Sequence, residues 1–436
     1  MKKMWLGLVT VLVLLATACG GGGGGGESTS GGPSGSAGGG PVEIVFWHGN
    51  SGQAGLECTK LVKQWNAANP DIQVKPVFYG SSDRALTKVE TAVASGTYPD
   101  IAYLYGSWAA NIATSPALLA LNDYIQNDPT FNWDDFWPAE RYAATVDGKI
   151  IGIPALVDNL AIVYNPALFD AAGIQYPTPE WTWDDFRAAA KAMTDPANQQ
   201  FGWAYPADAS EDTVWHWEAM LWEAGGDILN ADNTQAVFNS PQGVQALTVL
   251  QDMATVDHSI YIDTTNTKIG DVFNGGKIGM LVTGPWDLQG FKNVDYGVQI
   301  MPSFDDPSNH QTISGPDNWV LFNNGPERAQ AAFEFIKWYT EPDQDIQNAL
   351  YTATLPIRQS ELDVAGYQTF LDKYPGIQTF VENEQNALKA RPVTQKYPMV
   401  SEALGQAIVS VLLGKADAQT ALDQAAQAAN AALAAP

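Results

Sequence analysis

Two short apolar runs separated by polar residues lie in the stretch from 147 to 170. The first run is Ile150 to Ile153 and the second is Leu160 to Tyr164, and the pair Asp158-Asn159 stands between them. Apolar runs of this length are typical of buried strands. A carboxylate and an amide between them would be costly to bury without partners. The pattern therefore predicts that the chain passes from one core to another here, with Asp158 exposed in the gap. A strand with an ordinary polar turn fits these residues alone equally well.

Strands and helices alternate in the first part of the folded chain. The pattern predicts strands at 42–47, 72–79 and 99–104 and helices at 56–69 and 84–95. This order favours a mostly parallel sheet with helices on its faces. Ligands of such sheets meet the loops at the carboxyl ends of the strands. The candidate binding residues in those loops are His48, Asn50, Tyr105, Ser107 and Trp108.

Farther along, the pattern predicts both further helices and further strands. Helices are expected at 109–124, 134–142, 182–193, 213–224, 241–257, 329–340, 398–413 and 416–434, and strands at 277–282, 296–302 and 320–323. The pairs Asp134-Asp135 and Asp184-Asp185 fall in the predicted first turns of two of these helices. Carboxylates there favour the helix dipole, so we interpret both pairs as helix starts, with catalytic carboxylates as the alternative.

The positions of the tryptophans indicate which aromatic side chains lie outside the core. The helix at 213–224 carries Trp215, Trp217 and Trp222, and one of these is expected in the core while another faces a gap between domains. The sequence Gly-Pro after the strand at 277–282 predicts that Trp286 leaves the core at a helix start, with burial as the alternative. Fifteen Trp in all suggest flat apolar partners as well as core packing.

Length and charge narrow the class of protein. A chain of 436 residues can form two domains with separate cores. The formal charge of −26, with only 22 Lys and Arg, argues against nucleic acid or an anionic membrane surface as the main partner. The net charge does not exclude a neutral ligand. Two Cys define no disulfide framework, and Cys58 is expected to be a small buried hydrophobe.

The first forty residues have the pattern of an export segment. Residues 1–18 combine Lys2 and Lys3, a short apolar run and small residues, which is typical of a signal peptide. Cys19 follows, and the stretch resembles the bacterial lipobox, in which the Cys becomes the lipidated N-terminus; Ala16 stands where that pattern usually has Leu. Ordinary signal cleavage is the alternative. Residues 19–40 are rich in Gly and Ser and predict a flexible tether.

A family resemblance runs from Val42 to about Asn430. The stretches that carry it include IVFWHGN, YPDIAYLYG, GKIIGIPALVDNLAIVYNPALFDAAGI, GDVFNGGKIGMLVTGPWDL and ARPVTQKYPMVSEAL, in this order and spacing. The chain resembles the extracellular solute-binding proteins of carbohydrate ABC importers, the group that includes maltose-binding protein. The resemblance implies an α/β fold of two lobes, of the class II periplasmic-binding type, each with a mostly parallel sheet and joined by three crossings. It also implies a monomer on the outer face of the membrane, lipid-anchored at Cys19, that serves permease subunits and uses no cofactor, metal or nucleic acid.

The resemblance also implies domain limits. Crossings are expected near Val157 to Asn159, near Ile313 to Gly315 and near Ser360 to Gly366. The resulting segments are a first lobe at 41–157 and 315–362 and a second lobe at 158–314 and 363–436.

Site residues follow from the same resemblance. In the family, a carboxylate at the place of Asp158 bonds sugar hydroxyls, and aromatic residues at the places of Trp215 and Trp286 stack on sugar rings. The family usually has small residues where this chain has Asp317-Asn318-Trp319, so Trp319 either shortens the pocket or adds a stacking face. The expected ligand-binding set is His48, Asn50, Tyr105, Ser107, Trp108, Asp158, Asn159, Trp215, Trp286, Asp317, Asn318, Trp319 and Arg358.

Two other functions stay open at this point. The pair Trp47-His48 is also similar to relatives that bind glycerol phosphate compounds, whose phosphate requires cationic groups. Arg84, Arg358 and Arg391 are the candidates. A secreted glycosidase with paired carboxylates is the third hypothesis. No Ser-His-Asp, Cys-His or metal-ligand spacing supports an enzyme, and His48, His216, His258 and His310 are scattered.

Overall fold

The strands predicted in the first part of the chain form a five-stranded sheet that a late strand completes. Strands β1 and β2 are parallel, as are β1 and β3, whereas β13 is antiparallel to both of its neighbours. The prediction of a mostly parallel sheet is therefore confirmed. Its order is β2 (Ile72–Phe78), β1 (Val42–His48), β3 (Ile101–Tyr105), β13 (Asp317–Leu321) and β6 (Ile153–Leu156).

A second five-stranded sheet repeats this design farther along the chain. Here β7 is the reversed strand, antiparallel to β10 and β11, while β8 is parallel to β9 and β10. Its order is β11 (Gly297–Gln299), β7 (Ala161–Tyr164), β10 (Ile278–Thr283), β8 (Phe201–Pro206) and β9 (Ile260–Asp263). We call the first sheet with its helices the first lobe and the second sheet with its helices the second lobe.

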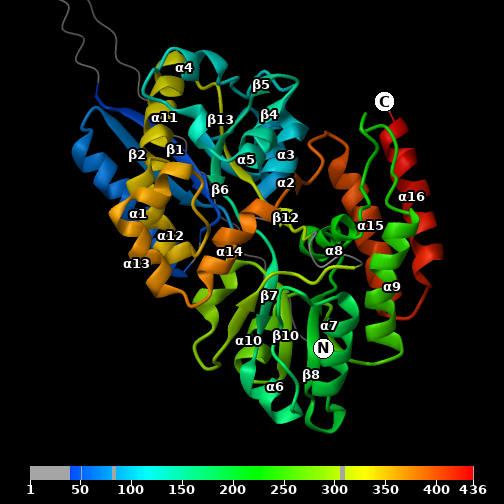
Figure 1. The fold of residues 1–436 in the computed structure, drawn as a ribbon. Coiled ribbons are helices and arrows are strands. Elements are labelled where there is room, and N and C mark those ends of the chain that lie inside the picture. Colours follow the sequence, from blue (N-terminus) through cyan, green and yellow to red (C-terminus); the bar gives the residue numbers. More distant parts are fainter. Residues whose placement is uncertain (1–39, 51, 81–84, 305–309, 436) are drawn as a thin grey trace, which may run out of the picture. The chain divides into compact units, whose positions relative to one another are not determined.

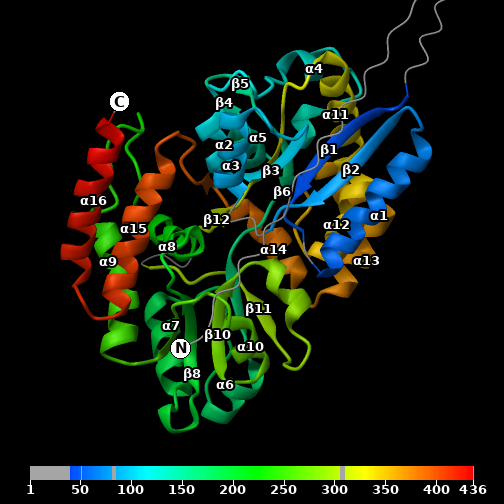
Figure 2. The same cartoon turned by 180° about the vertical axis from the view of Figure 1, so that it is seen from behind.

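Each sheet is packed against helices of its own (Figures 1 and 2). The first lobe has α1 (Gly52–Ala68), α2 (Ala85–Ser95), α3 (Gly106–Ile112), α4 (Asn122–Gln126), α5 (Pro138–Ala143), α11 (Pro326–Tyr339), α12 (Pro342–Thr352) and α13 (Ala365–Lys373). The second lobe has α6 (Pro166–Ala172), α7 (Trp183–Met193), α8 (Glu211–Glu223), α9 (Pro241–Thr255), α10 (Ile269–Asn274), α15 (Tyr397–Leu412) and α16 (Ala418–Ala434).

The two cores differ in their aromatic residues. Phe46, Trp319 and Tyr339 pack together in the first lobe, with ring centroids 4.8–5.8 Å apart. The second lobe buries Trp183, Trp203, Trp217 and Trp222 almost completely. A Cβ at Gly202 would stand 2.0 Å from the Ala190 carbonyl oxygen, so only glycine lets α7 approach β8 this closely.

The chain passes between the lobes at three places. Residues 157–160 join β6 to β7, and the chain reaches β13 from the second lobe through β12 (Ile313–Ser314). In the third passage, α14 (Ile377–Asn383) contacts β11 of the second lobe, β14 (Lys389–Ala390) pairs with β12, and α15 packs on α8 and α9. Because α13 still packs on α12, we propose that this last passage begins after α13, later than the expected place near Ser360 to Gly366. The other domain limits stay predictions.

The computed structural model describes residues 40–50, 52–80, 85–304 and 310–435. The predicted signal peptide, Cys19, most of the predicted tether and Arg84 lie outside these residues. Residues 41–436 form one compact unit. Among the described helices, none has the length and apolar character needed to cross a membrane.

Helix-start chemistry is confirmed at Asp184-Asp185, whereas Asp134-Asp135 lie in the first turn of a much shorter helix than predicted. Thr182 and Asp185 form a capping box at the start of α7. The predicted helix at 134–142 is instead a 3₁₀ turn, η2 (Trp133–Asp135), followed by α5, because Pro138 starts a new helix. Asp135 accepts hydrogen bonds from the backbone N–H and hydroxyl of Ser360 at 3.0 and 2.6 Å instead of capping a helix.

One predicted helix is broken, and the remaining elements are short. The helix expected at 109–124 is divided into α3 and α4, with a turn between them that includes the bridge from Leu118 to Phe322 of the first sheet. The short elements are β4 (Thr145–Val146), β5 (Lys149–Ile150), and the 3₁₀ segments η3 (Pro196–Asn198), η4 (Pro285–Gly290), η5 (Gln359–Asp363) and η6 (Glu384–Asn386).

Candidate functional site

Residues of both lobes line a cavity of about 800 Å³. Asn50, Tyr105 and Thr352 come from the first lobe, and Trp215 and Trp286 come from the second. Asp158 and Gly315 belong to two of the passages between the lobes and line the same cavity. The size is in the range of pockets that hold small molecules. The site therefore depends on segments that are far apart in the sequence.

Trp215 and Trp286 form an aromatic pair in this cavity. Their ring centroids are 5.5 Å apart with an interplanar angle of 41°. Trp286 is half-buried, at the start of η4, directly after β10. A Cβ at Gly284 would overlap the Trp286 ring at 1.8 Å, so glycine lets this ring fold back over the end of its own strand. Trp217 and Trp222 of the same helix as Trp215 are in the core, as the helix pattern allows.

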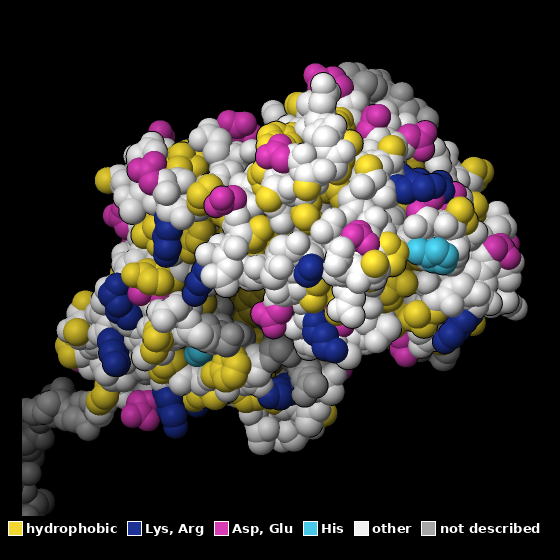
Figure 3. All heavy atoms as spheres, turned by 90° about the horizontal axis from the view of Figure 1, so that it is seen from below, with side chains coloured by type: hydrophobic (Ala, Val, Ile, Leu, Met, Phe, Trp, Pro, Cys, Tyr) yellow, Lys and Arg dark blue, Asp and Glu magenta, His cyan; other side chains and the backbone are white. Residues whose placement is uncertain are grey.

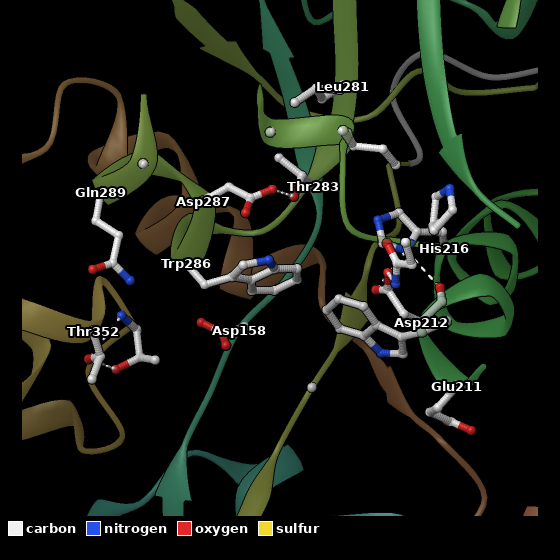
Figure 4. A pocket seen from close by; sticks show the side chains of 18 of the residues that line it. Asp158, Glu211, Asp212, His216, Leu281, Thr283, Trp286, Asp287, Gln289 and Thr352 are labelled. Atoms are coloured by element: carbon white, nitrogen blue, oxygen red, sulfur yellow. Dashed lines mark hydrogen bonds and ion pairs between the residues drawn. The ribbon is translucent and has the colours of Figure 1, made fainter. Parts of the chain in front are cut away.

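Asp158 lies beneath Trp286 in the close view of the pocket (Figure 4). Only 7% of the residue is exposed, whereas the sequence predicted exposure, because the first passage between the lobes is enclosed by the segments on both sides. Its Oδ1 atom has no hydrogen-bond partner within the described part of the chain. Burial raises the pKa of Asp158 well above its usual range, and Asp317 and Glu384 raise it further. An unpartnered carboxylate oxygen in a cavity can accept a hydrogen bond from a ligand.

A glycine brings the second passage against the first. The Gly315 N–H donates to the Asp158 carbonyl oxygen at 2.7 Å. A Cβ at Gly315 would stand 2.8 Å from the Trp215 ring. Glycine at this position therefore keeps Asp158 and Trp215 near one another at the floor of the cavity.

Arg391 stands between carboxylates of the two lobes. Its guanidinium is 3.4 Å from Glu211 of α8 and 3.5 Å from Asp317 of β13. The same group lies over the rings of Tyr105 and Trp215, at 5.1 and 6.0 Å. Burial alone would lower the pKa of Arg391, but Glu211 and Asp317 together raise it. Arg391 is therefore a charged residue whose cation is already paired.

A second polar group forms the wall of the cavity in the second lobe (Figure 4). The Asp212 carboxylate is 3.2 Å from the His216 ring and accepts a hydrogen bond from the Asn266 amide at 2.7 Å. Thr283 donates to Asp287 at 2.7 Å. Burial raises the pKa of Asp287 to about 6. Among the described residues, six acidic side chains and two cationic or titratable basic ones line the cavity: Asp158, Glu211, Asp212, Asp271, Asp287 and Asp317, against Arg391 and His216.

Six residues of the predicted binding set line the cavity, and seven do not. Those in the lining are Asn50, Tyr105, Asp158, Trp215, Trp286 and Asp317. Those outside it are His48, Ser107, Trp108, Asn159, Asn318, Trp319 and Arg358. All seven are 7% exposed or less, so each is enclosed by its own lobe or passage.

Packing explains the three loop residues outside the lining. His48 lies near the rings of Phe46 and Phe78, and burial lowers the pKa of its imidazole to about 4. Ser107 is buried in α3. Trp108, also in α3, packs behind Tyr105 with ring centroids 4.4 Å apart, so it supports the lining and does not form it.

Internal hydrogen bonds explain three of the others. Asn159 donates to the Phe380 carbonyl oxygen at 2.9 Å and to Glu384 at 2.6 Å. Asn318 donates to the Ala143 carbonyl oxygen at 3.0 Å, and the Arg358 Nε donates to the Thr340 carbonyl oxygen at 2.7 Å. Trp319 is in the core of the first lobe, so this aromatic residue neither shortens the cavity nor adds a stacking face.

The sequence reasoning missed several residues of the lining. Asp212 and His216 stand four apart on the helix that carries Trp215, and this spacing was the signal that could have found them. Asp287 directly follows Trp286. Asn266, Gln289, Thr352 and Thr354 carry no local signal, because only the fold brings their loops to the cavity. No cluster of His, Cys, Asp or Glu among the described residues is arranged to hold a metal ion.

This arrangement defines a class: a two-lobed ligand-binding protein with a polar, aromatic site between its lobes. The chain belongs to the family of bacterial extracellular solute-binding proteins, whose family model matches residues 49–346. The sn-glycerol-3-phosphate-binding periplasmic protein of Yersinia enterocolitica is 25% identical over 88% of this chain and 90% of its own length.

Two solved structures are similar over almost their whole length. One is the cyclic alpha-maltosyl-1,6-maltose binding protein of Arthrobacter globiformis, 31% identical with a TM-score of 0.77 over 90% of this chain and 99% of that one. The other is an ABC substrate-binding protein of Listeria monocytogenes in complex with cycloalternan, 26% identical with a TM-score of 0.81 over 90% of this chain and 98% of that one.

Proposed function

We propose that this protein captures a neutral sugar between its two lobes and delivers it to the permease of an ABC importer. The observation that carries the proposal is the Trp215–Trp286 pair beside the unpartnered Asp158 oxygen. A sugar ring has an apolar C–H face and a rim of hydroxyls. Trp can cover the face, and carboxylates can accept hydrogen bonds from the rim. The two solved relatives that bind cyclic sugars support the same ligand class.

The charge of the cavity distinguishes a sugar from a phosphate. A phosphate ligand needs cationic groups that are free to bind it. Arg391 is already between Glu211 and Asp317, and Arg358 is enclosed in the first lobe. Asp158 and Asp287 supply no positive charge to hold an anion. On the face in Figure 3, Lys and Arg side chains stand apart from one another, with Asp and Glu among them.

A receptor for a glycerol phosphate compound is the second candidate. It is favoured by Arg391 in the lining and by the 25% identity to the Yersinia protein. For this function Arg391 would have to leave at least one carboxylate to hold the phosphate. A sugar requires no such rearrangement, so we rank the sugar first.

A binding protein releases its ligand unchanged, which separates it from a glycosidase. Carboxylates in a sugar site could act as acid and nucleophile, but the relatives that the family comparison finds are named as binding proteins. Incubation with a labelled oligosaccharide tests this point. Recovery of intact ligand is expected; cleavage products that disappear with Asp158→Asn would make the protein an enzyme.

A thermal-shift screen tests the proposed ligand class. The chain from Cys19 onward suits it, because residues 41–436 form one compact unit. The panel contains maltose, maltotriose, cycloalternan, cyclic maltosyl-maltose and sn-glycerol 3-phosphate. A sugar at 100 times its Kd should stabilise the protein by about 2.7 kcal/mol. Stabilisation by glycerol phosphate alone would reverse the ranking.

Two Trp variants locate the binding site. Trp286→Ala should weaken sugar binding by about 2 kcal/mol or more, on the scale of an interface hot spot, and leave the fold intact. Trp181→Ala is the matched control, because Trp181 is a half-buried residue of the same lobe that packs near Phe169 outside the cavity. Equal affinity of the Trp286 variant and the wild type would remove the stacking role.

Membrane attachment at Cys19 is part of the proposal. The lipobox-like stretch before Cys19 and the tether after it are consistent with a receptor held on the outer face of the membrane. Mass spectrometry of the protein from its native membrane should find a diacylglyceryl group on Cys19, and Cys19→Ser should remove it. An unmodified Cys19 in membrane fractions would contradict the anchor.

A further inference from the structure

Asp263 holds together a loop that borders the cavity. It is the last residue of β9 and only 3% exposed. Its Oδ1 accepts from the Thr265 N–H at 3.0 Å and the Thr265 hydroxyl at 2.8 Å. Its Oδ2 accepts from the N–H groups of Thr267 and Lys268 at 2.9 and 2.7 Å. Four hydrogen bonds to one carboxylate fix the conformation of residues 264–268.

This loop presents Asn266 to the opposite helix. Asn266 has φ +48°, in the left-handed region that Asn tolerates better than most residues. Its amide donates to Asp212 Oδ2 at 2.7 Å, while Asp212 Oδ1 is 3.2 Å from His216. Asn266, Asp212 and His216 all line the cavity. The Asp263 side chain itself is absent from the lining, so any effect on the site has to pass through the loop.

We propose that Asp263 is a positioning residue of the ligand site, which fixes Asn266 against Asp212 and thereby orients the Asp212–His216 pair at the cavity wall. That this pair contacts a sugar rests on the proposed function, whereas the positioning does not. A carboxylate oriented before the ligand arrives loses less entropy on binding. Loss of Asp263 is expected to free Asn266 and to let Asp212 turn away from His216.

His216 provides a readout that needs no ligand. Burial by itself lowers the pKa of His216, but the neighbouring Asp212 more than offsets this and holds the pKa above its ordinary value. The groups that face His216 are the carboxylate of Asp212 and, at 2.8 Å, its backbone carbonyl oxygen, Asp287 of η4, and the rings of Trp215 and Tyr205. A shift of the His216 pKa therefore reports the orientation of Asp212.

Histidine NMR titration of the ligand-free protein tests the proposal, with His216→Gln used to assign the signal. Asp263→Ala should lower the His216 pKa by roughly half a pH unit or more. Asn266→Ala should lower it similarly, and the double variant should add nothing. Asp263→Asn keeps one acceptor oxygen and should give a smaller shift in the same direction. If Asp263→Ala does not fold, the His216 pKa of Asp263→Asn tests the proposal in its place.

Asp195→Ala is the matched control. Asp195 accepts from the Ala197 N–H at 3.1 Å and the Asn198 amide at 2.7 Å, a similar turn in the same lobe outside the cavity. This variant should leave the His216 pKa unchanged. An unchanged His216 pKa in both Asp263 variants would make Asp263 a structural residue only and overturn the proposal.

The affinity for maltotriose or cycloalternan separates this proposal from the proposed function. If either sugar binds, Asp263→Ala should weaken it about tenfold, as for the loss of one or two hydrogen bonds. The loss should not add to that of Asn266→Ala and should add to that of Trp286→Ala. Full additivity with Asn266→Ala would overturn the route through the loop. If neither sugar binds while the His216 pKa still moves, the positioning stands and the proposed function fails.

Discussion

Arg358 and Arg391 have similar surroundings, but only Arg391 lines the cavity. Each is at most 6% exposed, and each lies over aromatic rings near carboxylates. Arg358 donates to the carbonyl oxygens of Thr340 and Asn132 and lies 3.7 Å from the centroid of the Phe136 ring. Arg391 instead joins a carboxylate of each lobe at the edge of a cavity. A buried arginine with aromatic and acidic neighbours is therefore not enough to indicate a ligand site. The arginine and its neighbours must also line a cavity, as they do at Arg391.

The largest expected effect comes from Arg358→Ala. The change removes a cation from beside Asp135 and near the buried carboxyls of Glu361 and Asp345. Breaking a buried charged pair in this way costs about 3–5 kcal/mol of the free energy of unfolding, measured by urea denaturation. Arg358→Lys should not restore it, because Lys cannot reproduce the planar donors or the ring contact. A stable variant with weakened sugar binding would instead make Arg358 a ligand-binding residue.

Arg391→Gln should act mainly on ligand affinity. The change leaves Glu211 and Asp317 without their shared cation, at the cavity proposed to bind the ligand. Because this pair joins the two lobes at the cavity, its loss should weaken the lobe arrangement that holds the ligand and cost about 2 kcal/mol or more in binding, on the scale of a buried charged pair broken across an interface. Calorimetric titration with the sugar found in the screen measures it. Arg358→Gln should lose mainly stability and Arg391→Gln mainly affinity. If both variants lose stability and affinity in the same proportion, the proposed difference between the two arginines is wrong.

Asp158→Asn should have opposite effects on binding and stability. Loss of the acceptor charge should weaken sugar binding by about 1.5–3 kcal/mol, the range for hydrogen bonds to charged groups. The raised pKa of Asp158 means that its ionised form destabilises the folded protein. The wild type should therefore gain stability as pH falls through this raised pKa toward the ordinary value near 3.8.

Urea denaturation at two pH values measures the second effect. The stability advantage of Asp158→Asn over the wild type should be larger at pH 8 than at pH 5. If the wild type is the more stable protein at pH 8, the Asp158 carboxylate is satisfied within the fold and is not waiting for a ligand.

The smallest effect is expected at Asp134. Its carboxylate pairs with Arg141 at 2.5 Å but is 86% exposed, so Asp134→Ala should change stability by less than about 0.5 kcal/mol. Asp135→Ala is its matched partner, because Asp135 holds Ser360 and stands 3.7 Å from Arg358. It should cost about 1–3 kcal/mol. Equal effects of the two substitutions on stability would contradict the structural role of the contacts that Asp135 makes with Arg358 and Ser360.

Local patterns predicted most of the strands and helices and the two central aromatic residues. Trp286 could be found because a strand followed by Gly-Pro places the next side chain outside the core. Asp158 could be found because a polar residue between two buried strands has few other places to lie. The low exposure of Asp158 could not be predicted, because it depends on Gly315 and on the segments around Asp158.

The choice between the two arginines could not be made from the sequence. Arg358 follows a Leu-Pro-Ile run that enters the first-lobe core, whereas Arg391 directly follows β14. Their partners come from positions 132, 211, 317 and 340, which no local pattern relates to them. The same is true of Asn266, whose place depends on Asp263 and on a helix fifty residues earlier.

A crystal structure of the protein with the sugar found in the screen tests the central claim most directly. We expect the face of one sugar ring against Trp286, a hydroxyl within hydrogen-bond distance of Asp158 Oδ1, and contacts to both lobes. A sugar bound elsewhere, or held in this cavity with neither Trp286 nor Asp158 in contact, would contradict the account.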